Sequence, residues 1–304
     1  MRAAAPRSVA VGFFDGVHLG HRALLAGAEV ALTFVNHPLA VLAPGREPAL
    51  IMAVEERLAA IRATGVAEVI ALEFTPALAR LSPEEFLARH LKPLASPGGL
   101  CVRCGADWRF GRGGEGNAAW LRRHGVAVEE VPFASYRGGR VSSSRIRAAL
   151  AAGEIADANA MLGRAYGFTA AAVPGKGVGR ALGFATLNFP VKLPLRRGVW
   201  ALTVDGAAGI GNYGCAPTMG DKAWPSPVLE AHLLGPWRDT AAPGAPRRVE
   251  FTAFVREERA FPDLAALKAQ IAADCECREK MREPSENLPP GDGGLSALRR
   301  RSVL

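Results

Sequence analysis

The stretch Ser8-Val9-Ala10-Val11-Gly12-Phe13-Phe14-Asp15-Gly16-Val17-His18-Leu19-Gly20-His21 decides the fold of the first half of the chain. Its first six residues form an apolar run that ends in a Gly/Asp turn, which is typical of a buried strand in a parallel sheet. A helix is expected to follow from about Arg22. The turn between them is a natural phosphate site, because a helix N-terminus offers unpaired N–H groups and a partial positive charge.

Outward from this stretch, short apolar runs alternate with helical patterns. The further runs cover residues 30–35, 66–72, 99–104 and 126–131, and the helical segments cover residues 53–64, 83–94, 118–124, 144–150 and 156–162. This alternation predicts an α/β, Rossmann-like domain with a parallel sheet over residues 1–157. Ligands of such sheets bind at the carboxyl ends of the strands.

The pattern changes after Gly163. Short apolar segments separated by Gly, Pro and Asn run from Phe168 to Val255 without a helical period, which predicts a mainly antiparallel β-barrel. An amphipathic helix is expected from Asp263 to about Cys275. The second domain is therefore predicted over residues 158–282, and residues 283–304 are predicted to form a disordered tail.

Composition narrows the classes of function. Hydrophobic residues make up 49% of the chain and charged residues 22%, an ordinary globular balance. The net charge of +8 suits a nucleoside triphosphate as well as a nucleic acid. No nucleic-acid partner is predicted, because no Lys/Arg run interleaved with aromatic residues occurs in the folded region. No membrane partner is predicted either, and the absence of a secretion signal favours a cytoplasmic protein.

The five cysteines are interpreted as reduced thiols. Neither the pair Cys101 and Cys104 nor the pair Cys275 and Cys277 has the repeated CxxC spacing of a zinc ribbon. No zinc site is therefore predicted.

His18 and His21 carry the sharpest chemical signal. They lie three residues apart at the strand-to-helix turn, so both can point toward one triphosphate. A histidine pair alone is more often structural, and the surrounding glycines favour the phosphate role because they let the backbone approach a ligand closely.

Three later segments are expected near the carboxyl ends of other strands. They are residues 33–38 (TFVNHP), 105–111 (GADWRFG) and 142–147 (SSSRIR). The last is a hydroxyl-rich loop that enters a helix with arginines, which makes it a second natural phosphate site.

The order HxGH, TFxNHP, GxDWxFG and SSSRIR resembles that of the bacterial bifunctional riboflavin kinase/FAD synthetase (FMN adenylyltransferase) family, from about residue 8 to residue 282. The resemblance implies that an FMN phosphate oxygen attacks the α-phosphorus of ATP, the co-substrate, and that pyrophosphate leaves. It makes His18, His21 and Arg147 catalytic residues. The implied ATP and phosphate residues are Gly12, Phe13, Asp15, Gly16, Gly20, Asp107, Ser142, Ser143 and Ser144. The implied flavin residues are Asn36, His37, Pro38, Phe110, Arg256 and Glu258.

The second domain carries a separate glycine-rich segment with Gly175, Gly179 and Arg180. It is not a Walker A loop, because no GK[ST] closes it, but its amides are suited to ATP phosphates. Thr186 and Asn188 present oxygen ligands suited to Mg²⁺.

Glu230 lies in an apolar run and is expected to be a partly enclosed carboxylate, tunable as a base. By resemblance, it takes the proton of the riboflavin ribityl hydroxyl during attack on the γ-phosphorus of ATP. A paired strand carboxylate is the other interpretation.

The sequence departs from the family pattern in both halves. The interval from His21 to Thr33 is shorter, which is expected to leave one flank of the sheet less covered and to favour self-association. In the second half Ala185 replaces a proline, Trp200 replaces a tyrosine, and a longer turn follows Leu234.

The leading hypothesis is an enzyme that converts riboflavin to FMN and then FMN to FAD, with ATP consumed in each step. The partners are therefore the small molecules riboflavin, FMN and ATP. The alternatives are an FMN adenylyltransferase with a weak or inactive kinase domain, another HxGH nucleotidyltransferase, and a flavin-binding protein without activity.

Overall fold

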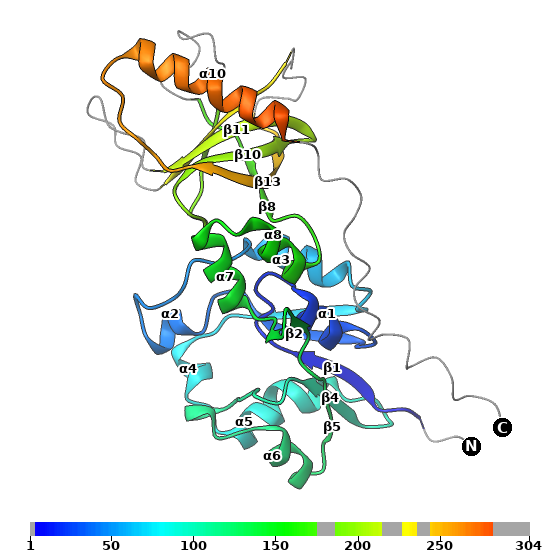
Figure 1. Ribbon diagram of the computed structural model, residues 1–304. Helices are drawn as coiled ribbons and strands as arrows, with labels where there is room; N and C mark the ends of the chain where they lie inside the picture. Colours follow the sequence, from blue (N-terminus) through cyan, green and yellow to red (C-terminus); the bar gives the residue numbers. More distant parts are fainter. Residues whose placement is uncertain (1–3, 175–185, 215–226, 236–243, 282–304) are drawn as a thin grey trace, which may run out of the picture. The chain divides into compact units, whose positions relative to one another are not determined.

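The structure is a computed structural model that describes residues 4–174, 186–214, 227–235 and 244–281 (Figure 1). The chain divides into two compact units, residues 1–258 and 259–304, and each is described by itself. The predicted phosphate residues Gly175, Gly179 and Arg180 lie outside the described residues, as does the predicted tail over 283–304.

Five parallel strands form the first sheet, in the order β3-β2-β1-β4-β5. They are β1 (Arg7–Val11), β2 (Val30–Phe34), β3 (Glu68–Leu72), β4 (Leu100–Cys104) and β5 (Ala127–Glu130). The predicted parallel α/β domain is therefore confirmed. β1 is the central strand, so the turn that follows it opens at the middle of the sheet edge (Figure 1).

The segments between and after these strands are mostly helical. They comprise α1 (Leu19–Leu25), α2 (Leu39–Leu42), α3 (Val54–Arg62), α4 (Pro76–Ala79), α5 (Pro83–Phe86), the π-helix η1 (Leu87–Leu91), the 3₁₀ helices η2 (Lys92–Leu94) and η3 (Arg112–Gly114), α6 (Ala118–Arg123), α7 (Ser143–Ala152) and α8 (Ile155–Leu162). A small hairpin, β6 (Ser135–Tyr136) and β7 (Gly139–Arg140), precedes α7.

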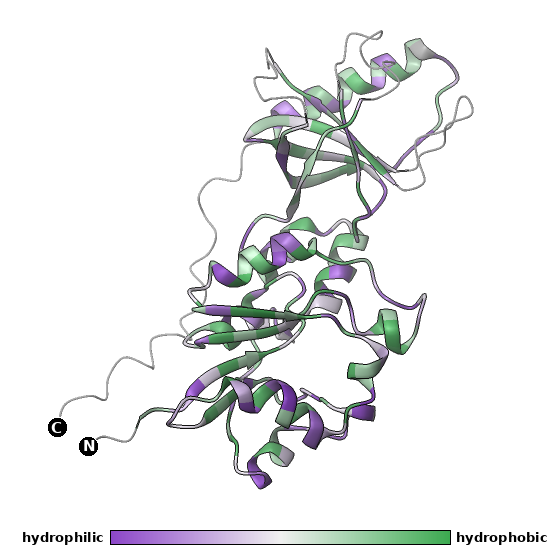
Figure 2. Cartoon of the chain, turned by 180° about the vertical axis from the view of Figure 1, so that it is seen from behind, coloured by the Kyte–Doolittle hydropathy of each residue, from purple (hydrophilic) through white to green (hydrophobic). Residues whose placement is uncertain are grey.

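β1 packs against a separate apolar cluster on each face of the sheet. Val9 and Val11 belong to one cluster, whereas Ala10 belongs to the other. All three are at most 3% exposed. Alternate strand residues point to opposite faces, so both faces of this central strand are buried, as the continuous apolar run predicts. Both sheets are largely hydrophobic along their strands (Figure 2).

The helix α7 begins at a sequence signal, and both α7 and α8 end at one. The Ser142 hydroxyl caps α7 by accepting a hydrogen bond from the Arg145 N–H at 3.3 Å, as an N-cap serine does. Both helices end at a glycine in the left-handed conformation, Gly153 after α7 and Gly163 after α8. The predicted domain boundary between residues 157 and 158 falls inside α8.

The second sheet is antiparallel and has six strands, in the order β8-β13-β10-β11-β12-β9. They are β8 (Gly167–Ala171), β9 (Thr186–Pro190), β10 (Gly198–Val204), β11 (Ala207–Gly214), β12 (Val228–Leu233) and β13 (Pro246–Arg256). The N–H of Val173, just after β8, donates to the Asn188 carbonyl of β9 at 2.8 Å. The two edge strands therefore nearly close the sheet into the predicted barrel.

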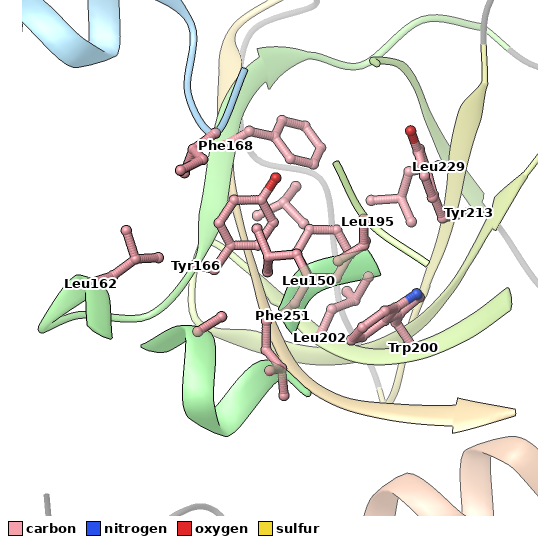
Figure 3. Packing of buried hydrophobic residues seen from close by; sticks show 14 of the residues in the cluster. Leu150, Leu162, Tyr166, Phe168, Leu195, Trp200, Leu202, Tyr213, Leu229 and Phe251 are labelled. Carbon is pink, nitrogen blue, oxygen red and sulfur yellow. The ribbon is translucent and has the colours of Figure 1, made fainter. Parts of the chain in front are cut away.

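The barrel core is aromatic, and two helices of the first half contribute to it. Figure 3 shows Trp200, Phe251 and Tyr166 gathered with Leu150 of α7 and Leu162 of α8 in one apolar cluster. Trp200 is fully buried, and its indole N–H donates to the Arg196 carbonyl at 3.0 Å. The tryptophan that replaces the family tyrosine at position 200 is therefore a residue of the barrel core.

The second unit contains α10 (Leu264–Lys280), whose N-cap is Asp263. The Asp263 carboxylate accepts a hydrogen bond from the Ala266 N–H at 2.7 Å. The predicted start of this helix is confirmed, but it continues five residues past the predicted end at Cys275. No helix in the described part of the chain is long and apolar enough to span a membrane.

Replacing Phe251 with Ala should destabilise the protein by about 3–5 kcal/mol, because the lost ring leaves a cavity in a close-packed core. Phe251 is fully buried and contacts the Trp200 ring at a centroid distance of 5.6 Å. The change is measured by urea denaturation. Leu42→Ala is the control, because Leu42 is 60% exposed and its loss should cost about 0.5 kcal/mol or less. Equal costs for the two variants would contradict this account of the core.

Candidate active site

The turn after β1 has an unusual backbone. Phe14, Gly16 and Val17 have φ angles of 57°, 84° and 38°. Glycine adopts this left-handed region freely, but a β-branched valine and a phenylalanine each cost about 1–3 kcal/mol there. Such a turn persists only when its surroundings hold it.

Asp15 anchors this turn to the start of α7. Its carboxylate, 1% exposed, accepts a hydrogen bond from the Ile51 N–H at 3.0 Å and pairs with the Arg147 guanidinium at 2.7 Å. The Ser143 hydroxyl donates to the Asp15 carbonyl at 2.9 Å. Burial raises the pKa of Asp15, while the Ile51 N–H and the Arg147 charge act in the opposite direction. Asp15 and Arg147 therefore tie the two predicted phosphate corners together.

His18 and His21 lie face to face at the start of α1. Their rings stack at a centroid distance of 3.6 Å, and the His18 Nδ1 accepts the His21 backbone N–H at 3.3 Å. His18 is thus the N-cap of α1. A neutral imidazole whose Nδ1 accepts a hydrogen bond carries its proton on Nε2. His18 therefore presents an N–H donor at its other nitrogen.

Both imidazoles are held neutral in the free protein. Burial, together with the smaller effects of the charges of Arg140 and Arg164, lowers the pKa of His18 to about 4. Burial also lowers the pKa of His21 well below its ordinary value, with His18 as the next cause. The buried His21 Nδ1 has no hydrogen-bond partner within the described residues. A bound anion would relieve both effects by favouring the charged imidazolium.

A cavity of about 300 Å³ brings the two phosphate corners together. His18 and His21 line it from the start of α1, and Ser142, Ser143 and Ser144 line it from the start of α7. The other lining residues are Val11, Gly12, Phe14, Gly20, Leu24, Gly105, Asp107, Trp108, Val131, Pro132, Phe133, Ala134, Arg140 and Val141. Residues from the ends of β1 and β4 thus meet over the sheet edge, where open parallel sheets bind ligands.

The barrel gathers its predicted site residues on neighbouring strands. Glu230 of β12 lies opposite Asn188 of β9 and, on its other side, opposite Asn212 of β11. The Asn212 side-chain amide donates to Glu258 Oε1 at 3.1 Å. Directly opposed residues of antiparallel strands have neighbouring side chains. Glu230, Asn188 and Glu258 are therefore brought into one group.

Comparison with known proteins matches the parallel-sheet region and the barrel region to separate family models. Residues 1–145 match the family model of FAD synthetase, and residues 162–281 match that of riboflavin kinase. The bifunctional riboflavin kinase/FMN adenylyltransferase of Escherichia coli (strain K12) is 32% identical over 289 residues, which cover 87% of this chain and 89% of that protein. The chain belongs to the bifunctional riboflavin kinase/FMN adenylyltransferase family.

Other relatives carry the same description. The protein of Pseudomonas fluorescens is 33% identical, with 90% of this chain and 93% of that protein covered. That of Bacillus subtilis (strain 168) is 29% identical, with 88% and 89% covered. A solved structure described as a macrolide-efflux protein from Streptococcus pneumoniae has a TM-score of 0.75 at 25% identity and covers 92% of this chain and 95% of that chain.

Several predicted nucleotide and flavin residues do not line the cavity. They are Phe13, Asp15, Gly16, Asn36, His37, Pro38, Phe110 and Arg147. The Asn36 amide is engaged in both directions with the Phe74 backbone, at 2.9 and 2.8 Å. His37 accepts a hydrogen bond from the Leu39 N–H. Phe110 is only 7% exposed and packs in the core beneath Trp108. Asn36, His37 and Phe110 thus make contacts within the protein, and the roles of all eight residues in binding stay predictions.

The environment of Glu230 differs from the predicted one. The sequence predicts a partly enclosed carboxylate, but Glu230 is exposed in the structure, whereas Asn188 is 5% exposed. The apolar neighbours Leu229 and Ala231 point to the other face of β12 and are buried, because strand side chains alternate. An apolar run therefore does not enclose every residue in it.

Three arginines that the sequence motifs do not single out lie at the cavity or beside the turn after β1. Arg140 lines the cavity, pairs with Asp107 at 2.7 Å and lies over the Phe133 ring at 3.5 Å. Arg57 is fully buried and lies over the Phe13 ring at 4.0 Å. The third, Arg164, donates a hydrogen bond to the Gly16 carbonyl in the turn after β1. The one sequence signal is the position of Arg140 two residues before the serine run.

Lowering the pH should destabilise the ligand-free protein through His18. Its pKa is about 4 when folded against 6.5 for the ordinary side chain, so the unfolded chain binds the additional proton between these values. The stability that the neutral imidazole contributes is fully present above about pH 6.5 and falls as the pH decreases, and the loss reaches about 3 kcal/mol at pH 4.

His18→Gln, which cannot titrate, should show a smaller loss of unfolding free energy between pH 7 and pH 4.5 by urea denaturation. Parallel profiles for the variant and the wild-type protein would contradict the buried neutral imidazole.

Proposed function

We propose that the chain phosphorylates riboflavin to FMN and then transfers the adenylyl group of ATP to FMN, giving FAD and pyrophosphate. The proposal assigns adenylyl transfer to residues 1–157 and the kinase reaction to residues 158–282. The observation that carries it is the single cavity that the His18–His21 corner shares with the Ser142–Ser144 corner.

In adenylyl transfer, an FMN phosphate oxygen forms a bond to the α-phosphorus of ATP, and the bond from that phosphorus to the bridging oxygen breaks as pyrophosphate leaves. The attacking oxygen is already anionic, so this step needs no base. It needs alignment and stabilisation of negative charge. The His18 Nε2–H and His21 are suited to the α-phosphate, and the hydroxyls of residues 142–144 together with the α7 N–H groups are suited to the outer phosphates.

The ligand-free protein already holds the two imidazoles where negative charge would develop. Both imidazoles are neutral because they are buried and lie near arginines. The triphosphate adds negative charge within the same cavity and raises both pKa values. Arg140 adds a cation at the wall, and its partner Asp107 holds it there in the free protein.

In the kinase reaction, the ribityl hydroxyl oxygen of riboflavin bonds to the γ-phosphorus of ATP, its proton passes to Glu230, and ADP leaves. Glu230 is exposed on β12, so it is accessible to a hydroxyl substrate. Thr186 and Asn188 of β9 offer the hydroxyl and amide oxygens that Mg²⁺ prefers. Bound there, Mg²⁺ would neutralise phosphate charge. No cluster of three or more His, Cys, Asp or Glu side chains competes for a metal within the described part of the chain.

An adenylyltransferase with an inactive kinase half is the second candidate. The motivating departures are Ala185 and the turn after Leu234, which lie largely outside the described residues. Trp200 does not favour this candidate, because it is buried in the core. Purified protein with riboflavin, Mg²⁺ and ATP, followed for FMN and FAD by chromatography, decides between them. The cytoplasmic location and the self-association stay predictions.

His21→Ala should lower the rate of FAD formation from FMN by about 100-fold or more, because it removes a preorganised group from the phosphate site. Riboflavin phosphorylation should be unchanged. His90→Ala serves as the control, since His90 packs on Phe86 outside the cavity. Loss of both activities in His21→Ala, with folding intact, would argue against two separate sites.

Glu230→Gln should do the converse and lower FMN formation by about 100-fold or more, because the amide cannot accept the proton. FAD formation from supplied FMN should continue. Glu250→Gln, on β13 beside Arg248, is the matched strand carboxylate and should retain both activities. A Glu230→Gln kinase with the wild-type rate would refute the role as base.

A further inference from the structure

Arg164 connects the region after α8 to the turn after β1. It follows the left-handed Gly163, and its guanidinium reaches back along the sequence to two carbonyl groups of that turn. One Nη2–H donates to the Gly16 carbonyl at 2.7 Å, and one Nη1–H donates to the Val17 carbonyl at 3.3 Å. The side chain is partly buried.

The two carbonyls belong to residues whose conformation is strained or unusual. Gly16 and Val17 have φ angles of 84° and 38°, and Val17 immediately precedes the N-cap His18. Of the other side chains that hold the turn, Ser143 and Arg147 act on Asp15, and the Thr33 hydroxyl donates to the Phe13 carbonyl at 3.2 Å. Arg164 therefore fixes the last peptide groups before the imidazoles, and these groups set the direction in which the chain enters α1.

Arg164 lies behind the turn, away from the nucleotide cavity. It does not line the 300 Å³ cavity with His18 and His21. It lines a second cavity of about 510 Å³, together with Val17, Arg22, Ala26, Ala60, Ala63 and Thr64. This second cavity borders the short helix α1, which has only seven residues.

The guanidinium keeps its charge in this position. Burial and the neighbouring charges of Arg22 and Arg248 lower the pKa of Arg164 to about 10, which still leaves it protonated at neutral pH. Its planar fork of donors matches two successive carbonyls, which a lysine ammonium cannot do with the same geometry.

We propose that Arg164 is a positioning residue of the adenylyl-transfer site, which holds the Gly16–Val17 turn so that His18 and His21 face the ATP phosphates. The inference rests on the proposed adenylyl transfer. Arg164 lies in the segment that matches the riboflavin kinase model, residues 162–281, yet it acts on the site in the segment that matches the FAD synthetase model.

The test is Arg164→Met in the full chain, with FAD formation from FMN and FMN formation from riboflavin measured separately. The kcat of adenylyl transfer should fall by about tenfold to 100-fold, since small displacements of catalytic groups have effects of this size. Riboflavin phosphorylation should stay within about twofold of the wild-type rate.

Arg22→Met is the matched control. Arg22 lines the same second cavity and carries the same charge, but its side chain has no hydrogen bond to the turn within the described residues. It should retain adenylyl transfer within about twofold.

A second measurement separates positioning from general stability. In Arg164→Ala, the lost guanidinium leaves space that joins the second cavity, so millimolar guanidinium should restore adenylyl transfer at least about threefold. Methylammonium, which has no planar fork, should not restore it. If Arg164→Ala fails to fold, Arg164→Lys takes its place and should keep the kinase while adenylyl transfer falls.

Three outcomes would overturn the inference. They are an Arg164→Met protein with the wild-type adenylyl-transfer rate, a parallel fall of both activities, or an equal loss in Arg22→Met. A wild-type protein that forms no FAD would instead refute the proposed function, so the two failures are distinguishable.

Discussion

The site depends on a backbone that does not hold its own conformation. Between β1 and α1 the chain passes through the left-handed region at Phe14, Gly16 and Val17. The buried Asp15 carboxylate, engaged by the Ile51 N–H and by Arg147, offsets that strain and ties the turn to α7. Because α7 begins at the serine run, this ion pair and the hydrogen bond from Ser143 to the Asp15 carbonyl hold the two walls of the cavity together.

The same packing sets the chemistry of the imidazoles. Stacking and burial remove His18 and His21 from water, which lowers the pKa of both imidazoles and keeps them neutral. A site that is neutral and short of hydrogen-bond partners is prepared for phosphate, because the ligand supplies both the charge and the acceptors. Within the described residues the buried Nδ1 of His21 has no hydrogen-bond partner, and under the proposed function a phosphate oxygen would supply one.

Much of this architecture could be predicted from local patterns. The apolar runs predict the five parallel strands, and the serine run at residues 142–144 predicts the start of α7 to within a residue or two, because both depend on signals within a few neighbouring residues. Contacts between distant segments could not be predicted in this way. Arg57 has the pattern of a surface residue on a helix, yet it is fully buried beneath Phe13. The exposure of Glu230 is likewise set by which face of β12 it occupies.

The core of the barrel has a consequence for how this protein could have evolved. α7 supplies the serine run at its first turn, and its apolar residues Ile146 and Leu150 belong to the same buried cluster as Trp200 and Phe251. A gene that encoded the first half alone would expose the part of this cluster that the barrel residues cover and would weaken the support of the cavity at the start of α7. Natural selection would therefore oppose separation of the two halves into independent genes, unless α7 first acquired a polar outer face.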